Sequence, residues 1–141
     1  MHNPVRTITP SAFEVLKKAQ QDAEVYMNPY VTPEHVLFQM EESGILRHSL
    51  EMASLSQVYF RERLGLFLSM LACDEHGQQL EVSSILGRAL EAAADIAASD
   101  LCPVDIPHLL IGISEQADSL AGYLLRKNPE VINGFRVNSS S

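Results

Sequence analysis

The chain has 141 residues, of which 46% are hydrophobic, and its formal net charge at pH 7 is −8. This length is sufficient for one globular domain that folds without disulfides or a bound metal. The acidic charge and the presence of only three lysines argue against a nucleic-acid partner, because a phosphate backbone requires clustered basic side chains. The two cysteines are too few to suggest a disulfide framework, and the N-terminus lacks the basic start and apolar run of a signal peptide. No apolar run approaches the roughly 18 residues that a membrane span requires. These features predict a cytoplasmic protein that binds no membrane.

Helical periodicity dominates the first half of the chain. Thr9 and Pro10 form an N-cap followed by a proline at the first helical position, and Thr32 and Pro33 repeat this signal. No segment has a convincing strand pattern, so we predict no β-strand. The helices expected in this half cover residues 10–26 and 33–42, a short segment with Ile45, Leu46 and Leu50, and a longer one that starts at Ser54 or Ser56 and turns Phe60, Leu64, Phe67, Leu68 and Leu71 inward.

The second half repeats this order. Ser83 caps a helix with an apolar face, Asp105 caps a helix that ends near Ser114, and a polar run over residues 115–119 separates it from the next helix. The remaining helices are expected around Leu120, Tyr123, Leu124 and Leu125, and from Asn128-Pro129 to Gly134, which should end the last helix.

A sequence signature occurs in both halves at a spacing of 73 positions. Residues 31–40 read VTPEHVLFQM and residues 104–113 read VDIPHLLIGI, with His35 and Leu37 matching His108 and Leu110. Such self-similarity indicates a duplicated structural unit. We therefore predict an all-α fold in which two pseudo-symmetric four-helix repeats pack into one domain. The boundaries expected are a first repeat over about 8–72, a linker over about 73–81, a second repeat over about 82–135, and a disordered tail at 136–141.

These two units, each with a small-residue helix, a loop and a short helix that opens with the histidine signature, resemble the double Clp N-terminal repeat of Hsp100 ATPases. Ser114-Glu115-Gln116 and the segment Tyr123-Leu124-Leu125-Arg126-Lys127 are most similar to the ClpA branch. The second copy departs from the family pattern, because Pro107 precedes His108 where Glu34 precedes His35. The resemblance implies a protein-binding module that docks a ClpS-type adaptor or unfolded substrates and presents them to ATPase domains of the same polypeptide.

The sequence itself carries no ATPase motif. A phosphate-binding loop requires a lysine directly after a glycine, and none of Lys17, Lys18 and Lys127 follows one. We therefore predict that this chain is not an enzyme and needs no cofactor. An alternative to the module is a free-standing regulator or holdase without a motor.

Two groups of residues could in principle bind a metal. Cys73-Asp74-Glu75-His76 combines a thiol, carboxylates and an imidazole, but four consecutive residues rarely form a tetrahedral site, so a polar linker is the favoured interpretation. His35 and His108 could ligate a metal or sense pH. We favour a structural role for both, in which each ring bonds to the backbone near the first turn of its helix.

An adaptor or substrate site is predicted where the first helix runs into its loop. Tyr26, Met27 and Tyr30 form an aromatic and methionine cluster beside Asn28-Pro29, a composition typical of adaptable interfaces. Glu24 and Glu34 flank this loop and could pair with basic side chains of a partner. The alternative is that the cluster packs over the core of the first repeat.

Overall fold

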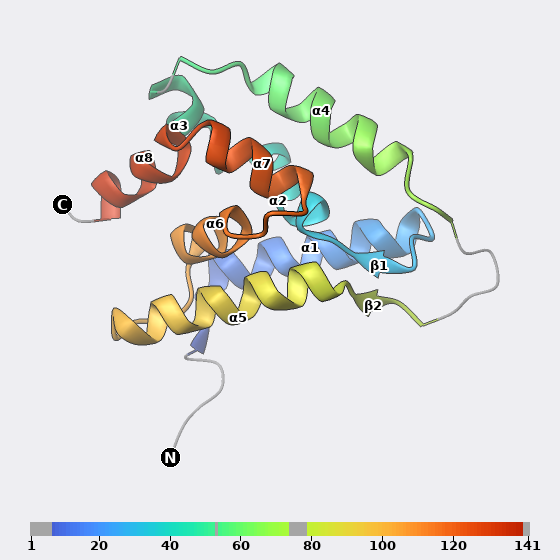
Figure 1. Ribbon diagram of the computed structural model, residues 1–141, viewed down its shortest axis with the longest axis horizontal. Coiled ribbons are helices and arrows are strands. Elements are labelled where there is room, and N and C mark those ends of the chain that lie inside the picture. The colour runs from blue at the N-terminus through green and yellow to red at the C-terminus, as the bar shows by residue number, and fades with distance from the viewer. Residues whose placement is uncertain (1–6, 53, 74–78, 140–141) are drawn as a thin grey trace.

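The computed structural model describes residues 7–52, 54–73 and 79–139, and the described part of the chain is mainly helical (Figure 1). The all-α prediction is confirmed. The helices are α1 (Pro10–Val25), α2 (Pro33–Glu42), α3 (Arg47–Met52), α4 (Gln57–Ser69), α5 (Ser84–Ser99), α6 (Ile106–Ser114), α7 (Leu120–Lys127) and α8 (Glu130–Ser139).

Most of these helices begin directly after an N-cap residue that the sequence predicted. The Thr9 hydroxyl accepts a hydrogen bond from the Ala12 amide at 3.2 Å, and Ser83 caps α5 in the same way through Leu86 at 3.1 Å. Of the two serines considered for α4, Ser56 is the N-cap. Short polar side chains here satisfy amides that have no partner inside the helix, which explains why local sequence located the helix starts.

The helices of the two halves follow one another at the spacing of the repeat. α2 and α6 begin at Pro33 and Ile106, α3 and α7 at Arg47 and Leu120, and α4 and α8 at Gln57 and Glu130, each pair 73 positions apart. One expected boundary was wrong: α8 continues through Gly134 to Ser139, so Gly134 does not end the helix and the predicted tail is helical as far as Ser139.

The prediction that the chain has no strand was also wrong. β1 (Tyr30–Val31) pairs in parallel with β2 (Glu81–Val82), and Ile8 forms a parallel bridge with Val104. Two-residue strands are too short for a period-two pattern, which is why the sequence did not reveal them. Each pairing joins the segment before the first helix of one repeat to the segment before the second helix of the other, so the repeats are bonded crosswise.

The two repeats share one core. α2 packs between α1 and α4, and α5 packs closely on α6 (Figure 1). The two helices approach closely at Gly112 of α6, which faces the backbone of α5 at Ala89 and Ala93, as small side chains permit. The largest fully buried side chains are Phe60, Leu37, Met40, Leu46, Leu50, Leu64, Leu86, Leu109, Leu110, Ile113, Leu124 and Leu125.

One carboxylate is buried between α2 and α4. The Glu41 Oε2 atom has no hydrogen-bond partner among the described residues and lies 3.5 Å from the Arg61 Nη2 atom, while Arg61 Nε lies 3.6 Å from Glu42 Oε1. Burial raises the pKa of Glu41, and the Arg61 charge opposes that rise. Arg61 therefore offsets part of the cost of burying this carboxylate.

Arg61→Ala is expected to lower the free energy of unfolding at pH 7 by about 1–2 kcal/mol. Removing one partner leaves a buried charge uncompensated, and the cost is below that of a fully buried pair because Arg61 is half-exposed. The ionised form of Glu41 is the one disfavoured in the folded state. The loss should therefore be full above its raised pKa and small at pH 3, where the carboxyl is protonated in both states. Urea unfolding at both pH values measures it.

The double variant Arg61→Ala/Glu41→Gln tests the cause, because an uncharged amide needs no counter-charge and should recover most of the loss. Arg63→Ala on the same helix is a matched control, since none of the ion pairs in the described part of the chain involves Arg63. An equal loss in the single and double variants would show that Arg61 acts through packing instead.

Candidate functional site

The loop after α1 is held by a buried asparagine. Asn28 accepts a hydrogen bond at its Oδ1 atom from His35 Nε2 at 3.0 Å, and its Nδ2 atom donates to the Ala72 carbonyl at 3.2 Å. The Asn28 amide also donates to the Ala23 carbonyl at 2.9 Å. Through its side chain and its backbone amide, Asn28 thus joins the end of α1, the start of α2 and the segment after α4.

His35 fixes the other side of this junction. The amide of Thr32 donates to the Nδ1 atom of His35 at 3.0 Å, which completes a reciprocal cap at the start of α2. Burial lowers the pKa of His35, and the Asp22 carboxylate opposes this only in part. The ring is therefore neutral at pH 7, with its proton on Nε2 and directed at Asn28. The ring makes the backbone hydrogen bond that its predicted structural role requires.

His108 caps α6 in the same way, since the Asp105 amide donates to its Nδ1 atom at 2.9 Å. Its Nε2 atom lies 3.3 Å from Asp100 Oδ2 and 3.7 Å from Cys102 Sγ, and the three potential ligand atoms lie within 4.8 Å of one another. Because Nδ1 accepts a hydrogen bond from the Asp105 amide, the neutral ring carries its proton on Nε2. A cation at Nε2 would require the ring to leave its cap, so this group fits a helix cap and not a metal site.

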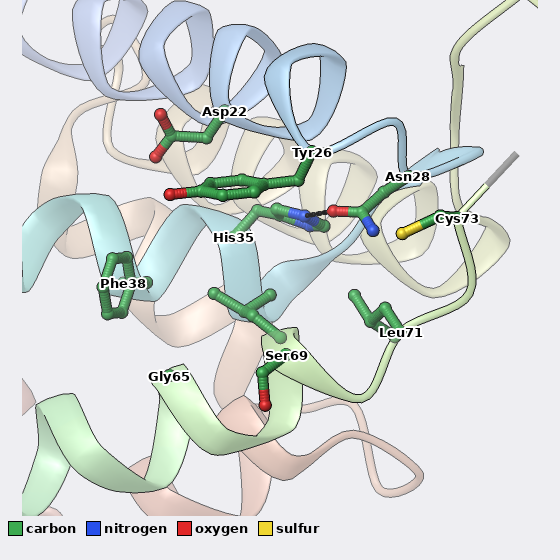
Figure 2. Close-up of a pocket in the computed structure, with 10 residues that line it drawn as sticks. Asp22, Tyr26, Asn28, His35, Phe38, Gly65, Ser69, Leu71 and Cys73 are labelled. Carbon is green, nitrogen blue, oxygen red and sulfur yellow. Dashed lines mark hydrogen bonds between the residues drawn. The ribbon is translucent and has the colours of Figure 1, made fainter. Parts of the chain in front are cut away.

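A cavity of about 280 Å³ opens beside the Asn28–His35 pair, between the end of α1, α2 and the end of α4 (Figure 2). Its walls are mainly apolar. Tyr26 directly follows α1, Phe38 comes from α2 and Leu68 from α4, while Asp22 of α1 contributes a carboxylate that accepts a hydrogen bond from Gln39. Figure 2 shows the Tyr26 ring lying over this hollow beside His35. Such a hollow can accept an apolar side chain of another molecule.

Exposed apolar side chains gather at the end of α1, and one of them, Tyr26, lines this cavity. We define the apolar rim as Val25, Tyr26, Met27 and Tyr30, all exposed, with Tyr26 66% accessible. Met27 has a left-handed backbone with φ of 55°, an uncommon conformation for a side chain of this size. Three of the predicted site residues thus lie near one another at the end of α1, where Tyr26 lines the cavity, and the exposed Glu24 directly precedes the rim.

Glu34 lies elsewhere, and its expected contact with a partner requires correction. It is 3% exposed, and its Oε2 atom accepts a hydrogen bond from the Ala121 amide at 2.9 Å, in the first turn of α7. The carboxylate therefore satisfies a helix N-terminus of the second repeat. Pro107, which occupies the matching position in the second copy of the histidine signature, has no carboxylate and cannot make such a contact. In the segment Cys73-Asp74-Glu75-His76, which was considered as a metal site, the last three residues lie outside the described part of the chain.

Sequence reasoning overlooked a counterpart of Met27 in the second repeat. Leu101 follows α5, has φ of 57° and is 93% exposed, and like Met27 it stands two positions before a proline. The shared order of Met27-Asn28-Pro29 and Leu101-Cys102-Pro103 was the available signal. Residues around Leu101, among them Ala94 and Ala98, border a second and shallower hollow of about 540 Å³.

The family model for the Clp repeat (R) N-terminal domain matches residues 7–128. The chain belongs to this family. None of the curated protein sequences matches it significantly. Among solved structures, this Clp N-terminal domain is similar to the Hsp104 N-terminal domain of Candida albicans, with 17% identity, a TM-score of 0.78, and coverage of 89% of this chain and 85% of that one.

Two ClpV structures share the fold of this Clp N-terminal domain. The N-domain of ClpV from Vibrio cholerae has 16% identity and a TM-score of 0.74, with 97% of this chain and 92% of that chain covered. A ClpV N-domain in complex with a VipB peptide has 18% identity and a TM-score of 0.70, with 92% and 89% covered. Among the described helices of this Clp N-terminal domain, none is long and apolar enough to cross a membrane.

Proposed function

We propose that this Clp N-terminal domain is a non-catalytic, protein-binding module of a cytoplasmic Clp-type ATP-dependent unfoldase, of the ClpA branch. It docks a ClpS-type adaptor or an exposed apolar segment of a substrate for delivery to ATPase domains in the same polypeptide and to their protease partner. Tethered docking raises the local concentration of substrate at a motor without tight binding.

The observation that carries this proposal is the exposed apolar rim at the end of α1, from which Tyr26 lines a preformed hollow. Large exposed apolar side chains cost free energy in water, and when they gather around a cavity they favour a protein partner. The aromatic and methionine side chains of the rim also match the composition of interface centres. The complex of a ClpV N-domain with a VipB peptide supports a peptide as the kind of ligand.

Tyr26→Ala is expected to weaken the binding of a ClpS-type adaptor about tenfold or more, because a tyrosine at the centre of an interface commonly contributes most of its affinity. Isothermal titration with purified adaptor, and fluorescence anisotropy with a labelled apolar peptide, measure the two candidate ligands separately. Tyr123→Ala is a matched control, since Tyr123 is an exposed tyrosine on α7 and does not line the hollow.

Equal affinities of the wild type and Tyr26→Ala for both ligands would remove the rim from the binding site. Binding of the peptide but not of the adaptor would favour direct substrate capture over an adaptor. The free-standing regulator or holdase is distinguished by the gene: a coding sequence that continues into a Gly-Lys-Thr phosphate loop supports the module, and one that encodes no motor supports the regulator.

A further inference from the structure

The hollow beside His35 is mainly apolar but contains one carboxylate. Phe38, Leu68 and Leu71 line it and are each partly exposed, so their apolar surface is open to a ligand. Among the described residues that line the hollow, Asp22 is the only one with a charged side chain, because the ring of His35 is neutral. A ligand can therefore make two kinds of contact here, one with apolar walls and one with a negative charge.

No basic side chain of the described residues pairs with Asp22. Its Oδ2 atom accepts a hydrogen bond from Gln39, and none of the ion pairs in the described part of the chain involves it. Lys18, one turn earlier on α1, lies 4.0 Å from the Glu14 carboxylate instead. Figure 2 shows the Asp22 carboxylate and the Tyr26 hydroxyl on the same side of the hollow, and the face of a tyrosine ring also attracts a cation. Both groups favour a ligand that carries a positive charge.

A glycine forms part of the wall of the hollow. Gly65 lies inside α4, and the nearest atom of another element to an added Cβ would be Phe38 Cε2, at 3.8 Å. Alanine is favoured over glycine in a helix interior, and its Cβ would fit here without overlap, so packing does not require the glycine. The missing side chain leaves open the space between α2 and α4 that a larger residue would fill.

The size and charge of the hollow select among possible occupants. Its volume of about 280 Å³ is just below the range of small-molecule pockets, roughly 300–1,000 Å³, and suits one large side chain. No lysine or arginine lines it among the described residues, and the exposed Glu24 directly precedes the rim. The chain has a net charge of −8, so a second copy carries the same excess of negative charge and is disfavoured at this acidic surface. A basic segment of another protein is attracted to it.

We propose that the hollow binds a protein segment in which a large apolar residue stands next to a lysine or arginine. The apolar side chain enters the hollow against Phe38 and Leu68, and the basic side chain pairs with Asp22 beside the Tyr26 ring. A segment with an acidic residue at that position is repelled, so the carboxylate discriminates between ligands. This inference rests on the proposed function and adds the chemical class of the segment that the module recognises.

The test uses the purified protein and two labelled peptides with blocked termini. In both peptides one phenylalanine stands in a glycine and serine segment, flanked on each side by lysine in the first peptide and by glutamate in the second. Fluorescence anisotropy measures the two affinities. The wild type should bind the lysine peptide at least about fivefold more tightly, as expected for a partly exposed ion pair. The preference should decrease in high salt, which screens such a pair.

Removing the charge of Asp22 tests the selection directly. Asp22→Asn keeps an oxygen that can accept the hydrogen bond from Gln39, and it should bring the two affinities to within about twofold of each other. Asp95→Asn is the matched control, because it makes the same substitution at an exposed position of α5 that does not line the hollow. This control should keep the full preference, which separates the local pair from the net charge of the chain.

Filling the hollow tests the apolar contact. Gly65→Leu places a side chain into the space beside Phe38 and should weaken both peptides about tenfold. Gly87→Leu is the matched control, since it makes the same substitution in α5, where an added Cβ meets nothing within 4 Å, and it should leave both affinities unchanged. Circular dichroism shows that each variant is folded.

Four results would overturn this proposal. The wild type could bind neither peptide or both equally, Asp22→Asn could keep the preference, or Gly65→Leu could leave the affinities unchanged. The fourth is a dimer in sedimentation that Gly65→Leu dissociates, which would identify a second copy as the occupant. Binding that Tyr26→Ala weakens but that shows no charge preference would refute only this inference. Adaptor and peptide binding that Tyr26→Ala leaves unchanged would refute the proposed rim, so the two failures are distinguishable.

Discussion

Glu34→Lys is expected to destabilise the protein by about 3–5 kcal/mol, a large share of the roughly 5–15 kcal/mol by which domains are stable. The Glu34 carboxylate is buried and accepts the Ala121 amide at 2.9 Å. A lysine would place an ammonium group against the positive end of α7, leave that amide without an acceptor, and bury a charge with no counter-charge. The midpoint of guanidinium unfolding, followed by circular dichroism at 222 nm, measures the loss.

Two variants separate the contributions at this position. Glu34→Gln keeps an oxygen acceptor and removes only the charge, so it should cost about 1–2 kcal/mol. Glu24→Lys makes the same charge change at an exposed site and should alter stability by less than about 0.5 kcal/mol. Equal unfolding midpoints for Glu34→Lys and Glu24→Lys would contradict the buried contact. Because Glu34→Lys is expected to unfold the domain, a loss of partner binding in this variant identifies a binding residue only if the variant is shown to be folded.

Local contacts account for what the sequence predicted well. The caps at Thr9, Thr32 and Ser83 bond to amides three residues ahead, so the residues that define a helix start stand next to one another in the sequence. The structural histidines belong to the same class, because His35 and His108 each bond to an amide three positions earlier. Such features can be read without knowledge of the tertiary fold.

Contacts between distant segments account for what the sequence did not reveal. Glu34 and Ala121 are 87 positions apart, and no local pattern indicates that the carboxylate turns inward. The strand pairing of Val31 with Val82 is equally non-local. At the candidate site, the aromatic cluster was recognised from composition, but the hollow beside it depends on Asn28 reaching the Ala72 carbonyl, 44 positions away.

Gly112→Ala is expected to destabilise the protein by about 3 kcal/mol or more, because α5 and α6 meet at this residue. A Cβ atom there would lie 2.3 Å from the Ala89 carbonyl oxygen and 3.2 Å from the Ala93 amide nitrogen. These are backbone atoms, so no side-chain rotation relieves the overlap and one helix must move. The displaced helix would lose contacts throughout the close-packed interface between α5 and α6. Thermal and urea unfolding measure the change.

Gly87→Ala is the matched control, since it makes the same substitution in α5, where an added Cβ meets nothing within 4 Å. Alanine has the higher helix propensity, so Gly87→Ala should stabilise the protein by about 0.5–1 kcal/mol. The same propensity gain acts at Gly112 and reduces the observed loss there, which makes the difference between the two variants the appropriate measure of the overlap. If both variants proved equally stable, α5 and α6 would have to separate at little cost, and the small-residue contact would not determine how the second repeat packs.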